Sequence, residues 1–288
     1  MRISRRLAAV LLSPLSLLLI AGGLVPATIL FVYSFYDYSL FQITPAFHLT
    51  WYRTILTDPI YRTVLRNTLA IAIPTVIVTI GAGYTIAYYL AFKSDRSRKP
   101  LFALIVVSML ASYLARIYAW RTLMGSDGII NSTLQGLGLT HHPIGWLIFS
   151  RVPVILAEVN LYLPIATLNL FASLSGIPAE LHEAARDLGA GSAQALRRVI
   201  VPLTGGALLG AGALCFFLSA GDYVTPAFLG GVISSQTFGT TIATAITTEG
   251  NYPLGSALSF GMVALFIAYT LALFLGLKAT RLLPRRQQ

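Results

Sequence analysis

Residues 183–191 read EAARDLGAG, a polar segment in a chain that is apolar almost everywhere else. Acids and an arginine crowd into this segment and the residues just before it, namely Glu180, Glu183, Asp187 and Arg186. Of the 288 residues, 56% are apolar and only 10% are charged, and the mean hydropathy is +0.75. A soluble domain carries about 25% charged residues, so a soluble core has no use for this much apolar surface. The composition therefore predicts a protein whose main solvent is lipid.

Six apolar windows are long enough to cross the bilayer as helices, which takes about 20 residues each. The first follows a basic start, but it is longer than a signal sequence and lacks a clear cleavage site, so we expect a retained transmembrane helix. In the fifth, Gly206 and Gly210 stand four apart, a spacing that permits close helix packing but is common by chance. We predict an all-α integral membrane protein with helices over residues 10–35, 68–92, 101–123, 147–172, 205–225 and 254–277.

Basic residues cluster at the ends of these windows, so the net charge of +10 points to membrane orientation and not to nucleic acid. Most of them fall on one side of the predicted topology, which the excess of Lys and Arg in cytoplasmic loops assigns to the cytoplasm. Both termini are then predicted to be cytoplasmic. The residues on this side are Arg2, Arg5, Arg6, Lys93, Arg96, Arg98, Lys99, Arg186, Arg197, Arg198, Lys278, Arg281, Arg285 and Arg286.

The polar segment lies within residues 178–202, which read PAELHEAARDLGAGSAQALRRVIVP. A proline in the first turn and Glu180 beside it favour a helix start, and Gly189 can end that helix. Ser192 can cap a second helix running to Pro202. The pattern predicts two short amphipathic helices joined at a glycine and exposed to the cytoplasm. From this pattern alone, a surface hairpin that merely connects two spans is an equal alternative.

The spacing within this stretch resembles the EAA loop of the membrane subunits of bacterial ABC importers. A Glu-Ala-Ala triplet begins at Glu183, three residues separate it from Gly189, and Pro202 closes the stretch. Val199 and Val201 stand where the family has Ile and Leu, and both are conservative changes. The resemblance implies that the loop between helices four and five docks on a cytoplasmic ATPase. The coupling residues it implies are Glu183, Ala184, Ala185, Asp187, Gly189 and Pro202.

Two further stretches are similar to the B-type permease of spermidine/putrescine importers, residues 112–139 (SYLARIYAWRTLMGSDGIINSTLQGLGL) and 221–231 (GDYVTPAFLGG). The resemblance implies a subunit in the bacterial inner membrane with a nonidentical second permease, two ATPases and a periplasmic solute-binding protein. The expected solute is a small cation of the polyamine class, or else another amine, an opine or an amino-acid-like solute. Since the chain has no GxxxxGK[ST] motif, we expect ATP and Mg²⁺ on the partner ATPase and no cofactor or enzymatic activity here.

Ionisable residues inside membrane spans are costly and are candidates for the transport pathway. Glu158 in the fourth helix is the clearest, and Tyr162 and Asn169 fall near the same line of that helix. A carboxylate, a phenol and an amide on one stripe suit the binding of an ammonium group. Asp222 and Tyr223, near the outer end of the fifth helix, form either an acidic entry to the pathway or a plain helix cap.

Arg116 argues against a cation pathway, because an unpaired arginine repels a cationic solute. Tyr113 and Trp120 lie about one turn on either side of it and complete the set of pathway candidates. Arg116 is a possible structural partner of either Glu158 or Asp222, which would make that acid a helix lock and not a solute ligand. Sequence alone leaves this pairing open.

The predicted domains are residues 1–66 (first helix and outer loop), 67–277 (the transporter domain) and 278–288 (a basic cytoplasmic tail). A gradient-driven secondary transporter is the main alternative, but that class often shows paired, interrupted helices in two halves. A membrane enzyme would need converging catalytic or metal-binding groups. The four histidines are dispersed and Cys215 is the single cysteine, so we predict neither catalytic residues nor a metal site.

Overall fold

The structure, a computed structural model, describes residues 17–18, 20–93, 96–178, 180, 191–280 and 282. It divides into two compact units. The first comprises the described residues up to Arg62 together with Thr241–Gly261, and the second comprises Thr63–Thr240 and the described residues from Met262 onward. In this part of the chain, three helices are long and apolar enough to cross a membrane, or up to five if each of two bent pairs counts as one span.

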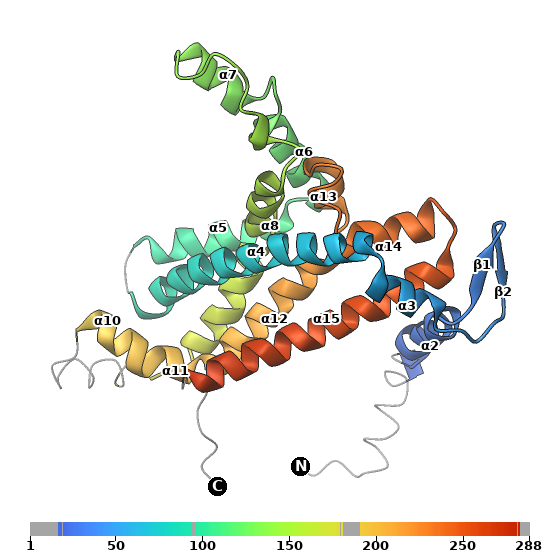
Figure 1. The fold of residues 1–288 in the computed structure, drawn as a ribbon. Coiled ribbons are helices and arrows are strands. Elements are labelled where there is room, and N and C mark those ends of the chain that lie inside the picture. Colours follow the sequence, from blue (N-terminus) through green and yellow to red (C-terminus); the bar gives the residue numbers. More distant parts are fainter. Residues whose placement is uncertain are drawn as a thin grey trace, which may run out of the picture. The chain divides into compact units, whose positions relative to one another are not determined.

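The three longest helices are strongly apolar: α4 (Pro59–Phe92), α8 (Arg151–Leu174) and α15 (Tyr252–Ala279). They match predicted windows because a segment of about 20 mostly apolar residues in lipid satisfies its backbone hydrogen bonds as a helix. Figure 1 shows the second unit, in which α5 (Arg98–Leu110), α6 (Tyr113–Met124) and α7 (Ile129–Gly136) precede α8. After α8 come α10 (Ser192–Ala195), η3 (Leu196–Ile200), α11 (Val201–Leu203), α12 (Gly205–Gly221) and α13 (Val224–Leu229), followed by α14 (Phe238–Thr247).

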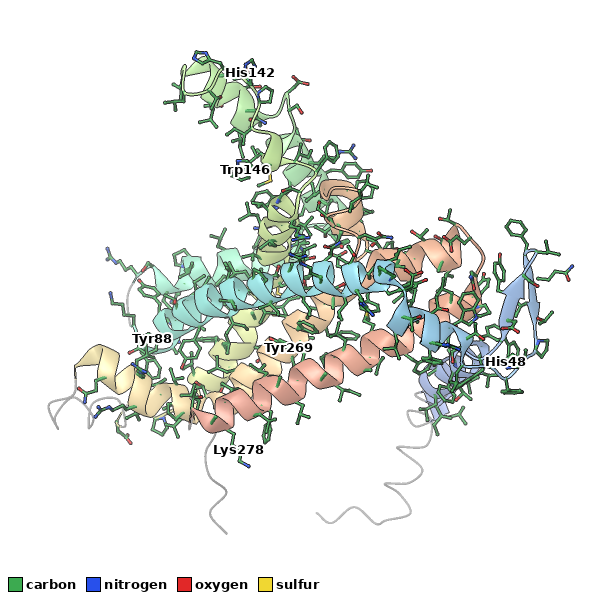
Figure 2. The ribbon with its side chains drawn as sticks, viewed as in Figure 1. His48, Tyr88, His142, Trp146, Tyr269 and Lys278 are labelled. Atoms are coloured by element: carbon green, nitrogen blue, oxygen red, sulfur yellow. The ribbon has the colours of Figure 1, made fainter. Side chains whose placement is uncertain are left out.

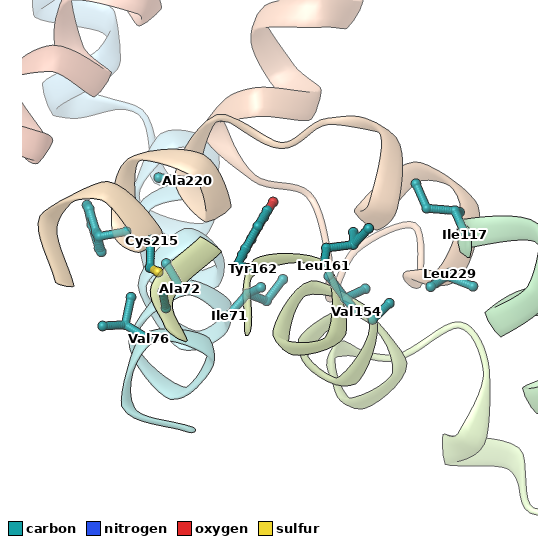
Figure 3. Packing of buried hydrophobic residues seen from close by; sticks show 13 residues of the cluster. Ile71, Ala72, Val76, Ile117, Val154, Leu161, Tyr162, Cys215, Ala220 and Leu229 are labelled. Carbon is teal, nitrogen blue, oxygen red and sulfur yellow. The ribbon is translucent and has the colours of Figure 1, made fainter. Parts of the chain in front are cut away.

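The core of the second unit lies where α4, α8 and α12 meet. Figure 3 shows buried side chains from these helices packed together, among them Ile71 of α4, Leu161 of α8 and Cys215 of α12. In the same cluster, the ring of Phe216 of α12 stacks on Tyr269 of α15 at 3.8 Å between centroids. Lipid tails are as apolar as these side chains, so close packing, more than exclusion of water, holds the helices together.

The first unit contains a small β-hairpin beside helices. A π-helical turn (η1, Ile20–Leu24) leads into α2 (Val25–Tyr33), and the strands β1 (Asp37–Ser39) and β2 (Gln42–Thr44) then pair antiparallel. Helix α3 (Thr50–Thr57) follows, and Phe31 of α2 contacts Phe260 of α15 at 5.2 Å between ring centroids. The fold is therefore mostly helical, but the two short strands depart from the all-α prediction.

One predicted span is bent, and a second bend lies just before another predicted span. The window 101–123 breaks between α5 and α6 with a 98° bend, and a 67° bend separates η3–α11 from α12 at Thr204. At the first break, Ala111 and Ser112 both take extended ψ angles near 135°. Apolar windows report only how much of a segment is apolar, so they cannot locate a break between two apolar helices.

The predicted outer loops hold more structure than expected. The loop 36–67 contains the hairpin, α3 and the start of α4, which begins at Pro59 and not at residue 68. The loop 124–146 contains α7, and Figure 2 labels His142 and Trp146 in the chain between α7 and α8. The loop 226–253 contains α14. The first predicted span lies partly outside the described residues, so the count of six spans stays a prediction.

Candidate functional site

Glu158 is fully buried among three helices of the second unit. Its side chain is 0% exposed, and its Oε2 accepts hydrogen bonds from Ser219 of α12 (2.5 Å) and Thr75 of α4 (3.2 Å). Its other oxygen, Oε1, is buried without a hydrogen-bond partner. Leaving a polar oxygen unpartnered in an apolar interior costs free energy, which marks Glu158 as a residue kept for more than packing. It does not line an open surface in this conformation.

Asp222 lies at the centre of a hydrogen-bonded network at the end of α12. Its Oδ1 accepts from the Tyr113 hydroxyl at 2.6 Å and from the backbone N–H groups of Val224 and Thr225 at 2.9 and 3.1 Å. Its Oδ2 accepts from the hydroxyls of Thr225 at 2.5 Å and Tyr162 at 3.2 Å. The carboxylate therefore caps the start of α13 and also joins α6 and α8. The sequence allowed Asp222 to be either an entry acid or a helix cap, and these two roles are compatible with each other.

The pairing of Arg116 with an acid, which the sequence left open, does not occur within the described residues. Its guanidinium donates to the carbonyl of Ala111 at 3.2 Å, and its Nε is buried without a hydrogen-bond partner. Ala111 ends α5 at the 98° bend, where the last carbonyls of a helix lack partners. Arg116 thus satisfies a carbonyl freed by the bend, and neither Glu158 nor Asp222 is neutralised by it.

An aromatic surface lies next to Asp222. Tyr113 is 36% exposed and Tyr223 is 53% exposed, whereas Asp222 itself is 7% exposed. Trp120 is half-buried, and its indole N–H donates to the side-chain oxygen of the exposed Asn160 at 3.4 Å. Aromatic residues near a carboxylate are a combination of groups that suits a cation.

The predicted polar stripe of α8 does not form one surface. Tyr162 is 7% exposed and bonds to Asp222, whereas Asn169 is exposed two turns further along the helix. The two positions share a direction on the helix, but their surroundings change along its axis because other helices cover only part of it. Asn169 is therefore separate from the Asp222 network.

The predicted coupling residues Glu183, Ala184, Ala185, Asp187 and Gly189 lie outside the described residues. Pro202 lies in α11, at the end of a helical run that begins at Ser192, so the second predicted helix of the loop is present. The GxxxG pair of α12 has no close neighbour here, since a Cβ added at Gly206 or Gly210 would meet nothing within 4 Å. Within the described residues, no three His, Cys, Asp or Glu side chains gather as a metal site.

Sequence analysis missed Thr75, Ser219 and Asn160. The first two are hydroxyl residues of apolar helices, which usually bond to their own backbone, so only packing shows that they reach Glu158. Asn160 could have been identified from the sequence. It is an amide in an apolar span four residues before Pro164, which has no N–H, so the Asn160 carbonyl lacks its usual helical donor.

Several long apolar helices define a multi-pass membrane protein, and comparison with known proteins identifies its class as transport. A model of the family described as binding-protein-dependent transport system inner membrane component matches residues 68–288. The spermidine/putrescine transport system permease protein PotB of Haemophilus influenzae is 32% identical over 234 residues, covering 81% of this chain and 80% of that protein. The inner membrane ABC transporter permease protein YdcU of Escherichia coli is 28% identical over 251 residues, covering 82% and 79%.

Solved structures share the fold. A bacterial ABC transporter involved in the import of the acidic polysaccharide alginate matches with a TM-score of 0.75 at 16% identity, covering 96% of this chain and 94% of that one. A second structure, of the alginate transporter in complex with an alginate pentasaccharide-bound periplasmic protein, matches with a TM-score of 0.72 at 15% identity, covering 93% and 92%. The chain belongs to the family of binding-protein-dependent transport system inner membrane components, and it is a permease subunit of an ABC importer.

Gly239, in the first turn of α14, tests how Asp222 is positioned. A Cβ at this glycine would lie 2.7 Å from the carbonyl oxygen of Asp222 and 2.8 Å from that of Gly221. Backbone atoms cannot give way as a side-chain end can, so we expect Gly239→Ala to destabilise the protein by about 1–3 kcal/mol. Thermal unfolding of the purified protein measures this. The control is Gly210→Ala, which adds the same methyl group in open space; equal melting temperatures for the two variants would refute the close approach.

Proposed function

We propose that this chain is one of two membrane subunits of an ATP-driven importer for a small cationic solute of the polyamine class. The observation that carries the proposal is the carboxylate of Asp222, which has no cationic partner among the described residues, accepts a hydrogen bond from the partly exposed Tyr113 and directly precedes the exposed Tyr223. The relatives named as spermidine/putrescine permeases point to the same chemistry. Another small amine, an opine or an amino-acid-like solute is the alternative.

The solute contacts we propose are those of the aromatic surface. The rings of Tyr223, Tyr113 and Trp120 attract an ammonium group through their faces. The side chain of Asn160, and its backbone carbonyl freed by Pro164, add neutral acceptors. Asp222 supplies the negative charge that selects a cation over a neutral solute of the same size.

Glu158 and Tyr162 form the second layer of this proposed site. Glu158 is 0% exposed, so in this conformation it acts on a solute through its field and not through contact. Its hydrogen bonds to Thr75 and Ser219 join α4, α8 and α12. Alternating access requires such helices to move against one another, and a shift of α12 would change both the position of Glu158 and that of Asp222. Asn169 is kept as a candidate for the inner part of the pathway.

The partners we propose are a second, nonidentical permease, two ATPases that bind ATP and Mg²⁺, and a periplasmic solute-binding protein. The solved alginate transporter bound to its periplasmic protein supports the last of these. We further propose six spans in the bacterial inner membrane with both termini and the loop 178–202 in the cytoplasm. The basic residues Arg197 and Arg198 at the end of η3 support this orientation.

A substitution that removes the carboxylate of Asp222 tests the solute class. In cells that express the whole importer, we expect Asp222→Asn to reduce uptake of labelled spermidine about tenfold or more, a loss of about 1.4 kcal/mol in transition-state binding. Tyr223→Ala should reduce uptake as well, because it removes an exposed ring that makes no hydrogen bond among those described here. Glu158→Gln should impair uptake while the complex stays assembled.

The matched control is Asp58→Asn. Asp58 also caps a helix, accepting a hydrogen bond from the N–H of Ile60 at 2.8 Å, but it lies at the start of α4 in the first unit. The importer with Asp58→Asn should take up spermidine at the normal rate. If neither Asp222→Asn nor Tyr223→Ala affected spermidine uptake, this surface would not belong to the pathway. If an opine inhibited uptake by competition and polyamines did not, the alternative solute would be favoured.

The coupling loop is tested at Gly189. We expect Gly189→Asp to release the ATPase or to uncouple ATP hydrolysis from uptake, because the new side chain adds bulk and charge at the proposed turn between the coupling helices. ATPase co-purification and solute uptake measure the two effects separately. Gly136→Asp is the control, since a Cβ there meets nothing within 4 Å in α7. Retention of both ATPase binding and transport in Gly189→Asp would contradict the coupling role.

A further inference from the structure

The turn of the β1–β2 hairpin carries two apolar side chains that almost nothing covers. The pairing of Ser39 with Gln42 leaves Leu40 and Phe41 as a two-residue turn. Their side chains are 92% and 89% exposed. Single exposed apolar residues are common, but adjacent ones at the tip of a projecting element need an apolar environment outside the chain.

The backbone of this turn is poorly suited to the residues that occupy it. Leu40 and Phe41 have φ angles of 50° and 61°, in the left-handed region. Two-residue hairpin turns with positive φ at both positions favour Asn-Gly, because branched and bulky side chains are strained there. The backbone conformation of the turn therefore does not explain why Leu and Phe occupy it. A requirement for their apolar side chains explains the pair.

The hairpin lies at the level where apolar helices end. The hydroxyl of Tyr38 donates to the carbonyl oxygen of Glu249 at 2.5 Å, which lies between the end of α14 at Thr247 and the start of α15 at Tyr252. The apolar run of α15 begins directly after this point. Since the ends of such runs mark the boundary of the hydrocarbon layer, the hairpin lies at the bilayer surface.

The chain around the hairpin has the composition of a membrane interface. The indole N–H of Trp51 donates to the carbonyl of Tyr36 at 2.9 Å, and the hydroxyl of Tyr52 donates to Ser34 at 2.8 Å. Trp and Tyr are enriched at both membrane surfaces, where one end of the side chain is apolar and the other is hydrated. Further exposed apolar side chains follow the hairpin: Phe47 at 77%, Leu49 at 64% and Leu56 at 76%.

We infer that the Leu40–Phe41 turn inserts into the lipid of the bilayer surface opposite the coupling loop and anchors the first unit there. The side of the membrane rests on the proposed topology, but the contact with lipid does not. Residues 38–44 carry no charged side chain, which suits a lipid surface better than a protein partner that is recognised through charge.

Site-directed spin labelling of the full chain in lipid nanodiscs tests this inference. Cys215 is the single cysteine and is buried, so labels at Leu40→Cys and Phe41→Cys can be placed selectively, with the wild-type chain as the labelling blank. Power saturation compares the access of oxygen, which concentrates in lipid, with that of a water-soluble nickel chelate. Leu271→Cys, 55% exposed on α15, is the lipid reference, and His142→Cys is the water reference.

The turn labels are expected to show the oxygen preference of Leu271. A nickel preference like that of His142 would overturn the inference, and so would nickel access that is lost only when the solute-binding protein is added, because the turn would then be a protein docking surface. A double variant, Leu40→Asn with Phe41→Gly, suits the turn but removes its apolar side chains. When a spin label at Ser39→Cys serves as the reporter, this double variant should increase the access of the nickel chelate to the label relative to that of oxygen. Unchanged access would contradict anchoring by these side chains. None of these outcomes depends on transport activity.

Discussion

A carboxylate held in an apolar helix bundle must find its hydrogen-bond donors within the chain, and Asp222 finds five. These donors come from α6, α8 and the first turn of α13, so one side chain determines where three helices meet at the end of α12. The backbone contributes as well, because Gly239 brings α14 against the carbonyl of the same residue. The geometry of the candidate site therefore depends on a single charged group.

The same arrangement has a use in transport. Five donors satisfy the oxygens of the Asp222 carboxylate, and no ion pair to Asp222 or Glu158 is present among the described residues. In the proposed function, this carboxylate is the group that attracts the cationic solute. Because the network links separate helices, any helix movement that opens or closes a pathway also moves the charge, which is the coupling that alternating access needs.

The sequence predicted the parts of the structure that depend on local composition. Long apolar runs identified α4, α8 and α15, and the polar exceptions within apolar segments identified Glu158 and Asp222. Contacts between residues far apart in the sequence could not be predicted. Nothing in the sequence pairs Tyr113 with Asp222, 109 positions away. The 98° bend was missed because hydropathy is summed along a segment, and the partner of Arg116 was left open because a carbonyl freed by that bend cannot be read from hydropathy.

The central claim is that this permease works only as one subunit of a larger ATP-driven complex. Gentle extraction of the tagged chain from its native membrane, followed by mass spectrometry of the stoichiometric partners, tests this most directly. We predict a second, related permease and an ATP-binding subunit in fixed ratio. A chain that purifies alone or only with copies of itself, under conditions that keep a known ABC importer intact, would contradict the account.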